Sequence, residues 1–175
     1  MLRRLVCLLL TVPPLCAADA PMRTPPQSPD AVAVRDFGVP LPSRYRDWRL
    51  ITVAHEEGSL NDLRAILGND VAIKAFRAGK RPFPDGTIIA RLAWRYVPSP
   101  EDNTAFGRPQ SFVAGAPANG VQFMVKDSKK YATTGGWGFA QFNDGKPVDP
   151  PLLTTCYTCH RQIAPRDLVF SHYAP

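Results

Sequence analysis

The chain has 175 residues, 45% of them hydrophobic and 21% charged, a composition that suits one folded domain and excludes wholesale disorder. Its 21 basic residues exceed its 15 acidic ones, but they are scattered along the chain, so no nucleic-acid partner is expected. No apolar stretch reaches the roughly 18 residues of a transmembrane helix, so stable membrane insertion is not expected either.

Residues 1–18 predict a signal peptide. Two arginines precede a short apolar run at residues 5–12, and small residues follow at positions 16–18, where a signal peptidase cleaves. The sequence therefore indicates export to the periplasm. Acylation of Cys16 and a buried N-terminal helix are alternatives that the adjacent prolines disfavour.

The next segment, residues 19–43, is rich in proline. Proline fixes φ and removes a backbone donor, so this segment is expected to form an extended lead-in with little helix or sheet. A single folded domain is expected over residues 44–175.

The folded domain is rich in residues typical of strands. β-branched and aromatic side chains gather at residues 48–53, 87–97, 121–125 and 137–142, and residues 63–67 form a further apolar run. The turns between these segments are short, so neighbouring strands are expected to be antiparallel. The chain is therefore predicted to be an α+β protein, an antiparallel β-sheet with a few short helices.

Helical signals are few. Asn69 or Asp70 can cap a helix over residues 71–78, which Gly79 ends. Residues 98–108, in contrast, are expected to form a loop.

The strongest functional signal is the motif Cys156-Tyr157-Thr158-Cys159-His160. A CxxCH motif in an exported protein is typical of covalent haem attachment. One helical turn brings both thiols to the same side, where each can form a thioether with a haem vinyl group, and the histidine can bind the iron. The sequence therefore predicts one covalent haem c, held by Cys156, Cys159 and His160 on a C-terminal haem-attachment helix.

Three other interpretations of this motif remain open. A zinc site needs further ligands, such as His172, and no second cysteine pair remains after cleavage. A thioredoxin-like redox pair needs a βαβ context, which the sequence lacks. A structural disulfide leaves His160 unexplained.

The second axial position of the iron has no convincing ligand in the sequence. His55 is expected in a polar loop, His172 lies near the C-terminus, and Met22 lies in the lead-in. Met124 is expected inside a strand, where methionine is usually part of the core. A five-coordinate iron that binds small diatomic or N-oxide ligands is therefore the leading hypothesis.

Around this motif the chain resembles the cytochrome P460 family, which includes the beta-type cytochromes c′. The resemblance covers residues 44–173. It rests on the order and spacing of these segments: Tyr45-Arg46-Asp47-Trp48, Leu63-Arg64, Phe83, Asp85-Gly86-Thr87, Val125-Lys126-Asp127-Ser128, Trp137, Cys156 to His160, and Val169-Phe170.

The resemblance implies an antiparallel sheet with a few helices, a homodimer, and a five-coordinate haem with His160 as the proximal ligand. Members of this family that oxidise hydroxylamine carry a bond between a haem meso carbon and a lysine nitrogen. The beta-type cytochromes c′ lack this bond and bind nitric oxide or carbon monoxide in an apolar pocket.

Two positions depart from the hydroxylamine-oxidising pattern. Arg91 stands where that pattern has the cross-linking lysine, and Gln122 stands where it has a distal glutamate, whereas Arg64 matches a family arginine. Arginine stays protonated and is not the amine nucleophile that the cross-link needs, and glutamine cannot accept a proton as a carboxylate does. Arg64, Arg91 and Gln122 are therefore candidate distal-pocket residues, with pairing to a haem propionate as an alternative role for Arg91.

Alternation along residues 121–125 places Gln122 and Met124 on one face of the strand, and Val121, Phe123 and Val125 on the other. If Gln122 faces the iron, Met124 lies nearby on the same face. This keeps a six-coordinate iron with histidine and methionine ligands as an alternative.

Taken together, these features predict a periplasmic monohaem c-type cytochrome that binds nitric oxide or a related small ligand and has a periplasmic electron-transfer partner. One alternative is an oxidoreductase that converts hydroxylamine or another reduced nitrogen species. The other is a simple electron-transfer cytochrome.

Overall fold

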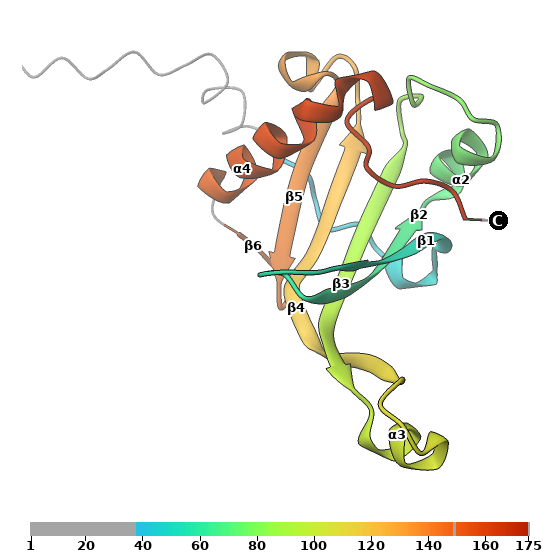
Figure 1. Cartoon of the computed structure of the whole chain (residues 1–175). Helices are drawn as coiled ribbons and strands as arrows, with labels where there is room; N and C mark the ends of the chain where they lie inside the picture. The colour runs from blue at the N-terminus through green and yellow to red at the C-terminus, as the bar shows by residue number, and fades with distance from the viewer. Residues whose placement is uncertain (1–37, 149, 175) are drawn as a thin grey trace, which may run out of the picture.

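The computed structural model of the chain describes residues 38–148 and 150–174 (Figure 1). The predicted signal peptide at residues 1–18 and the lead-in up to residue 37 lie outside the described residues. None of the described helices is long and apolar enough to cross a membrane.

The described part of the chain is built on one six-stranded antiparallel sheet, in which each strand pairs with the next strand in sequence. The strands are β1 (Arg49–Glu56), β2 (Asp62–Gly68), β3 (Ile88–Pro98), β4 (Phe112–Lys126), β5 (Trp137–Asn143) and β6 (Lys146–Pro147). The helices described with them are α2 (Asp70–Arg77), α3 (Pro100–Phe106) and α4 (Pro150–His160). This architecture confirms the predicted α+β class and the helix near the C-terminus.

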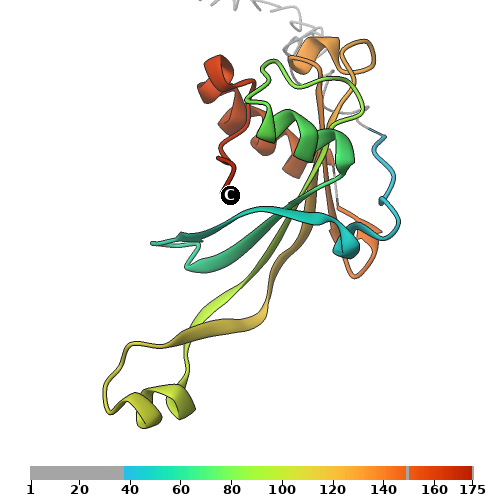
Figure 2. The same cartoon turned by 90° about the vertical axis from the view of Figure 1, so that its right-hand side faces the viewer.

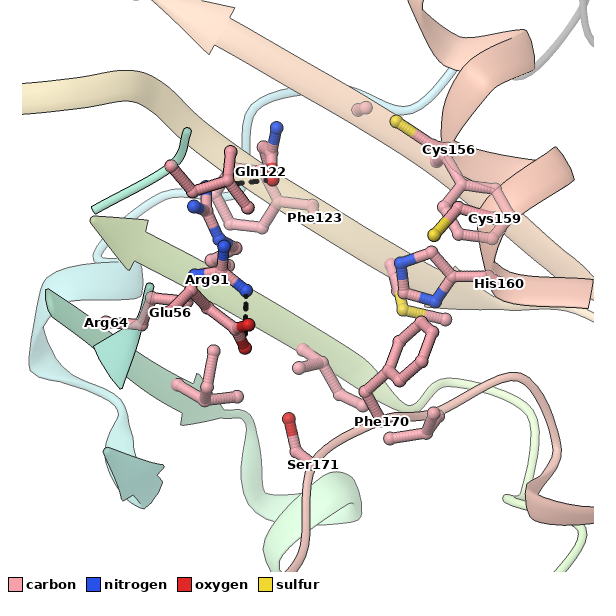
Figure 3. A pocket seen from close by; sticks show the side chains of 17 residues that line it. Glu56, Arg64, Arg91, Gln122, Phe123, Cys156, Cys159, His160, Phe170 and Ser171 are labelled. Carbon is pink, nitrogen blue, oxygen red and sulfur yellow. Dashed lines mark hydrogen bonds and ion pairs between the residues drawn. The ribbon is translucent and has the colours of Figure 1, made fainter. Parts of the chain in front are cut away.

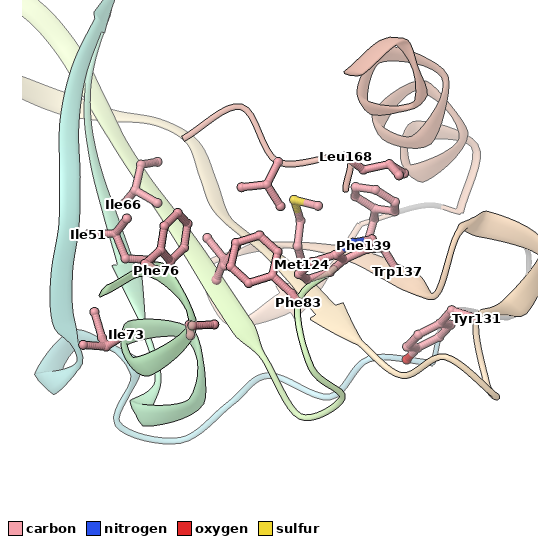
Figure 4. Close-up of a cluster of buried hydrophobic side chains, with 14 residues drawn as sticks. Ile51, Ile66, Ile73, Phe76, Phe83, Met124, Tyr131, Trp137, Phe139 and Leu168 are labelled. Atoms are coloured by element: carbon pink, nitrogen blue, oxygen red, sulfur yellow. The ribbon is translucent and has the colours of Figure 1, made fainter. Parts of the chain in front are cut away.

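Side-chain alternation gives the sheet two different faces. The first face packs against α2, α4 and the C-terminal segment, and its core is shown in Figure 4. The opposite face carries a second apolar cluster, against which Tyr45 and Trp48 pack. Figure 2 shows the sheet close to edge-on, with α2 and α4 on one side and the first described residues on the other.

Helix α2 begins one residue before the predicted range and is fixed to the sheet by its cap. The Asn69 Oδ1 accepts hydrogen bonds from the backbone N–H groups of Ala72 (3.0 Å) and Ile88 (3.1 Å). Its Nδ2 donates to the Gly86 carbonyl at 2.8 Å. One short polar side chain therefore satisfies the helix N-terminus and joins it to the start of β3.

The expected loop at residues 98–108 is wrong, because it contains α3. The Ser99 side chain accepts a hydrogen bond from the Asp102 N–H, Pro100 occupies the first turn, and Gly107 ends the helix with φ of 65°. These are ordinary start and stop signals for a helix.

Two strands extend well beyond their predicted ranges. Strand β4 begins nine residues before the expected segment at 121–125, because it pairs with β3 through two register shifts, at Leu92/Trp94 and Trp94/Tyr96. The outer parts of β3 and β4 form a two-stranded arm that extends beyond the rest of the sheet, with α3 at its tip (Figures 1 and 2). Strand β1 also continues to Glu56, so His55 lies in a strand and not in the expected loop.

Candidate functional site

The C-terminal motif lines a cavity. Helix α4 carries Cys156, Cys159 and His160, and all three border a cavity of about 360 Å³ between this helix and the first face of the sheet (Figure 3). A volume of this size lies within the range of cofactor and small-molecule sites. The two thiol groups point to the same side of the helix, as the spacing of the motif predicts.

His160 is held in one orientation. Its Nδ1 lies 2.7 Å from the Leu168 carbonyl oxygen. Because a carbonyl can only accept, Nδ1 carries the hydrogen and Nε2 keeps its lone pair. Its ring packs between Phe139 and Phe170, with centroid distances of 5.1 and 5.0 Å. Burial lowers the pKa of His160, although its bond to Leu168 opposes this, so the imidazole is neutral as a metal ligand must be.

The wall across the cavity from His160 is polar. Strand register places Arg91 of β3 opposite Gln122 of β4, and Gln122 opposite Gln141 of β5. Arg91 Nη1 donates to Gln122 Oε1 at 3.0 Å, and Gln122 Nε2 donates to Gln141 Oε1 at 2.7 Å. Arg64 of β2 borders the same cavity, so the structure brings together all three residues that the sequence singles out as distal candidates.

Asp62 holds the two arginines in place. Its carboxylate is fully buried and accepts from Arg64 Nε and from Arg91 Nη2, each at 2.6 Å. Sequence reasoning missed this residue. The spacing Asp62-Leu63-Arg64 could have indicated it, because residues two apart in a strand place their side chains, here a carboxylate and a guanidinium, on the same face.

Glu56 brings a carboxylate to the cavity that the sequence did not indicate. It lies at the end of β1, borders the cavity, and pairs with Arg64 Nη1 at 3.0 Å (Figure 3). Its side chain is 47% exposed, so it lies at the solvent side of this wall. No sequence pattern links Glu56 to Arg64; only the pairing of β1 with β2 does.

The guanidinium groups retain donors for a ligand. Burial lowers the pKa of Arg91, and the like charge of Arg64 adds to this lowering, whereas Asp62 opposes it. Arginine remains charged despite such shifts. Each guanidinium has five N–H donors, more than its bonds to Asp62, Glu56 and Gln122 use, so this wall can donate further hydrogen bonds into the cavity.

Among the other candidate axial ligands within the described residues, only Met124 borders the cavity. It pairs with Phe139, whose ring contacts His160, so Met124 lies near His160 and not across the cavity from it. His55 is exposed and stacks on Tyr96 at 3.9 Å, and His172 is exposed near the C-terminus. As predicted, Gln122 and Met124 face the same way, opposite to Val121 and Phe123, although Val125 packs against the first cluster.

The donor set fits a haem c. Two thiols lie one helical turn apart, a neutral imidazole presents Nε2, and the surrounding side chains are largely apolar. Burial raises the pKa of Cys156, so its sulfur stays a thiol and not a thiolate ligand. The described residues contain no group of three or more His, Cys, Asp or Glu side chains placed to hold a metal ion, which leaves the zinc alternative without a ligand set. Cys156 and Cys159 are not joined by a disulfide.

Comparison with known proteins adds one finding. The family model described as Cytochrome P460 matches residues 42–171, which include the whole cavity. No curated protein matches the chain.

The buried carboxylate of Asp62 is expected to be the most important single group for the stability of this wall. Replacing it in Asp62→Ala leaves two largely buried guanidinium groups without their shared partner, which should lower the free energy of unfolding by about 3–5 kcal/mol. Glu56→Gln is the matched control, because it removes only the half-exposed partner of Arg64 and should change stability by less than about 1 kcal/mol. Urea denaturation measures both; an equal, small loss in the two variants would contradict the role of Asp62.

Proposed function

The chain belongs to the cytochrome P460 family, and from this premise we propose that it is a periplasmic cytochrome with one haem c that binds nitric oxide or a related small ligand. Membership of this family implies that the protein is a cytochrome and carries a haem cofactor. Covalent attachment, the single haem, the periplasmic location and the ligand are the parts that we propose.

The observation that carries the proposal is the placement of the CxxCH motif. The motif lies on one side of a cavity whose other side carries Arg91 and Gln122 (Figure 3). In this arrangement Cys156 and Cys159 would hold the haem through thioethers, and His160 would bind the iron. The signal peptide predicted at residues 1–18 agrees with this, because haem is attached to CxxCH motifs outside the cytoplasm.

When bound, the haem supplies an iron with an open coordination position for a small diatomic or N-oxide ligand. The residues of the chain determine what enters that position. Phe139 and Phe170 pack on either side of the His160 ring. Arg91 can donate hydrogen bonds from the opposite wall, and so can the second N–H of the Gln122 amide, whose first N–H is bonded to Gln141. No methionine or histidine of the described residues lies across from His160, which favours a five-coordinate iron over the simple electron carrier.

Oxidation of hydroxylamine is the second candidate function, and Glu56 is the observation that favours it. Gln122 cannot accept a proton, but the Glu56 carboxylate borders the same cavity. The Glu56 carboxylate is already paired with Arg64 and lies half-exposed at the solvent side of the cavity wall. Arg91 also remains where a lysine is needed for the haem cross-link. Both features leave nitric oxide binding as the better-supported function.

Covalent attachment can be tested directly. In the Cys156→Ala/Cys159→Ala variant, no thioether can form, so haem should be lost from the protein on a denaturing gel stained for haem peroxidase activity. His160→Ala is the matched control, because both thioethers remain and the stain should persist even though the iron has lost its ligand. Persistence of the stain in the double cysteine variant would contradict haem c.

The ligand is tested by optical spectra of the ferric and ferrous protein, with and without nitric oxide. We expect an ordinary high-spin haem c spectrum that changes on adding nitric oxide. Met124→Leu conserves volume and should leave the spectrum unchanged, because Met124 is not an iron ligand in this proposal. A low-spin, methionine-ligated spectrum that Met124→Leu abolishes would instead support the electron carrier, and a red-shifted ferrous Soret band would support a haem cross-link and hydroxylamine oxidation.

We also propose a homodimer, as the family resemblance implies. Phe106, Phe112 and Val113 at the end of the β3–β4 arm are 59%, 44% and 42% exposed, an apolar group that a second copy of the chain would cover. Phe106→Ser should therefore shift the protein toward the monomer in light scattering. Leu50→Ser is the control, because Leu50 is 50% exposed but lies on β1, away from the arm tip. Unchanged mass in Phe106→Ser would contradict this interface.

A further inference from the structure

A buried ion pair lies behind the proximal histidine. Lys126, at the end of β4, is only 6% exposed and pairs with Asp167 at 2.7 Å, whose side chain is 10% exposed. Neither residue borders the cavity, so neither can contact a ligand there. Two charges removed from water in this way need further partners, and both have them.

The partners of this pair come from three separate segments. Lys126 Nζ donates also to the Gly135 carbonyl at 3.0 Å and lies 5.0 Å from the centre of the Trp137 ring. The second oxygen of Asp167 accepts from the Phe83 backbone N–H at 2.7 Å. The carboxylate is therefore anchored to the end of β4 and to the loop before β3.

Asp167 is the residue directly before Leu168, whose carbonyl holds His160. Both residues have left-handed backbone conformations, with φ of 52° for Asp167 and 63° for Leu168. Such a conformation is unfavourable for residues other than glycine and persists only where surrounding contacts hold it. The anchored Asp167 side chain supplies that hold on one side.

The Leu168 side chain also holds this left-handed turn in place, through its packing in the core. Leu168 is 7% exposed and belongs to the first apolar cluster, where it lies above Trp137 and Phe139 (Figure 4). Gly135, whose carbonyl accepts from Lys126, also lies against Leu168: a Cβ on it would approach the Leu168 Cδ1 to 3.3 Å. Lys126 and Leu168 therefore both contact the loop that contains Gly135.

We propose that the Lys126–Asp167 ion pair is a positioning device for the proximal histidine, because it fixes the turn from which the Leu168 carbonyl accepts the His160 Nδ1–H. A hydrogen bond at this nitrogen makes imidazole a stronger metal ligand. The pair therefore sets the strength of the iron–histidine bond without touching the haem site. This inference rests on the proposed haem c function.

The test uses the holoprotein with its haem. In Asp167→Asn and Lys126→Met, the turn should loosen and the bond to His160 Nδ1 should weaken. We expect the iron–histidine stretching band in the resonance Raman spectrum of the ferrous protein to move to lower wavenumber, and the reduction potential to rise, because a weaker donor stabilises ferric iron less.

Two controls separate positioning from general stability. Ile73→Ala removes buried methyl groups from α2 but none of the bonds to Asp167, so it should lower the melting temperature and leave the Raman band in place. Lys126→Arg keeps the charge and should retain the wild-type band even if Lys126→Met folds poorly.

The outcomes distinguish this proposal from the one on which it rests. A wild-type protein without haem c, judged by its pyridine haemochrome spectrum, overturns the proposed function. Haem c with an unchanged band and potential in both Asp167→Asn and Lys126→Met overturns only the positioning role. An equal band shift in Ile73→Ala also overturns it.

Discussion

Strand register in the antiparallel sheet determines which side chains face the cavity. On the first face, one row of paired residues is apolar, with Ile89, Met124 and Phe139 in line, and the next row is polar, with Arg91, Gln122 and Gln141 in line. The two rows are separated by two residues along each strand, or about 7 Å. Helix α4 packs beside the apolar row, so the polar row is left facing the cavity.

Two buried carboxylates stabilise the two sides of this cavity in different ways. Asp62 joins two arginines on the side that would receive a ligand, and these guanidinium groups still present donors to the cavity. Asp167 has its two oxygens occupied by Lys126 and a backbone N–H, and acts on the cavity only through the neighbouring Leu168. Asp62 therefore shapes the arginine wall of the cavity directly, and Asp167 acts on the opposite wall, at His160, through the backbone.

The sequence sufficed for those parts of the site that depend on local spacing. The CxxCH motif predicted the helix and the direction of its thiols, and alternation predicted that Gln122 and Met124 share a face. Asp62 was within reach of the same argument. Glu56 and the Leu168 carbonyl were not, because each meets its partner through tertiary packing: the pairing of β1 with β2 in one case and the turn after α4 in the other.

For the fold, too, the features that local sequence determines were predicted, and most of those that depend on tertiary pairing were not. Four of the strands were found from β-branched and aromatic residues, whereas the outer half of β4 was missed because alanine, glycine and proline there carry little strand signal and pair only through shifted register with β3. Helix α3 was missed although Ser99, Pro100 and Gly107 signal it. A short helix at the tip of an arm buries none of its own residues, so hydrophobic periodicity cannot detect it.

The position of the Glu56 carboxylate decides whether the polar wall can accept a proton from a bound molecule or only donate hydrogen bonds to it. A proton acceptor in a haem pocket is effective when it is shielded from water and directed at the bound molecule. Glu56 is half-exposed and engaged by Arg64, while the central position of the wall is an amide whose oxygen and nitrogen are both already bonded, to Arg91 and Gln141. Such a wall can hold a small ligand through donated hydrogen bonds but offers it no buried base. For this reason the geometry favours ligand binding at the proposed haem over proton-coupled oxidation of a substrate.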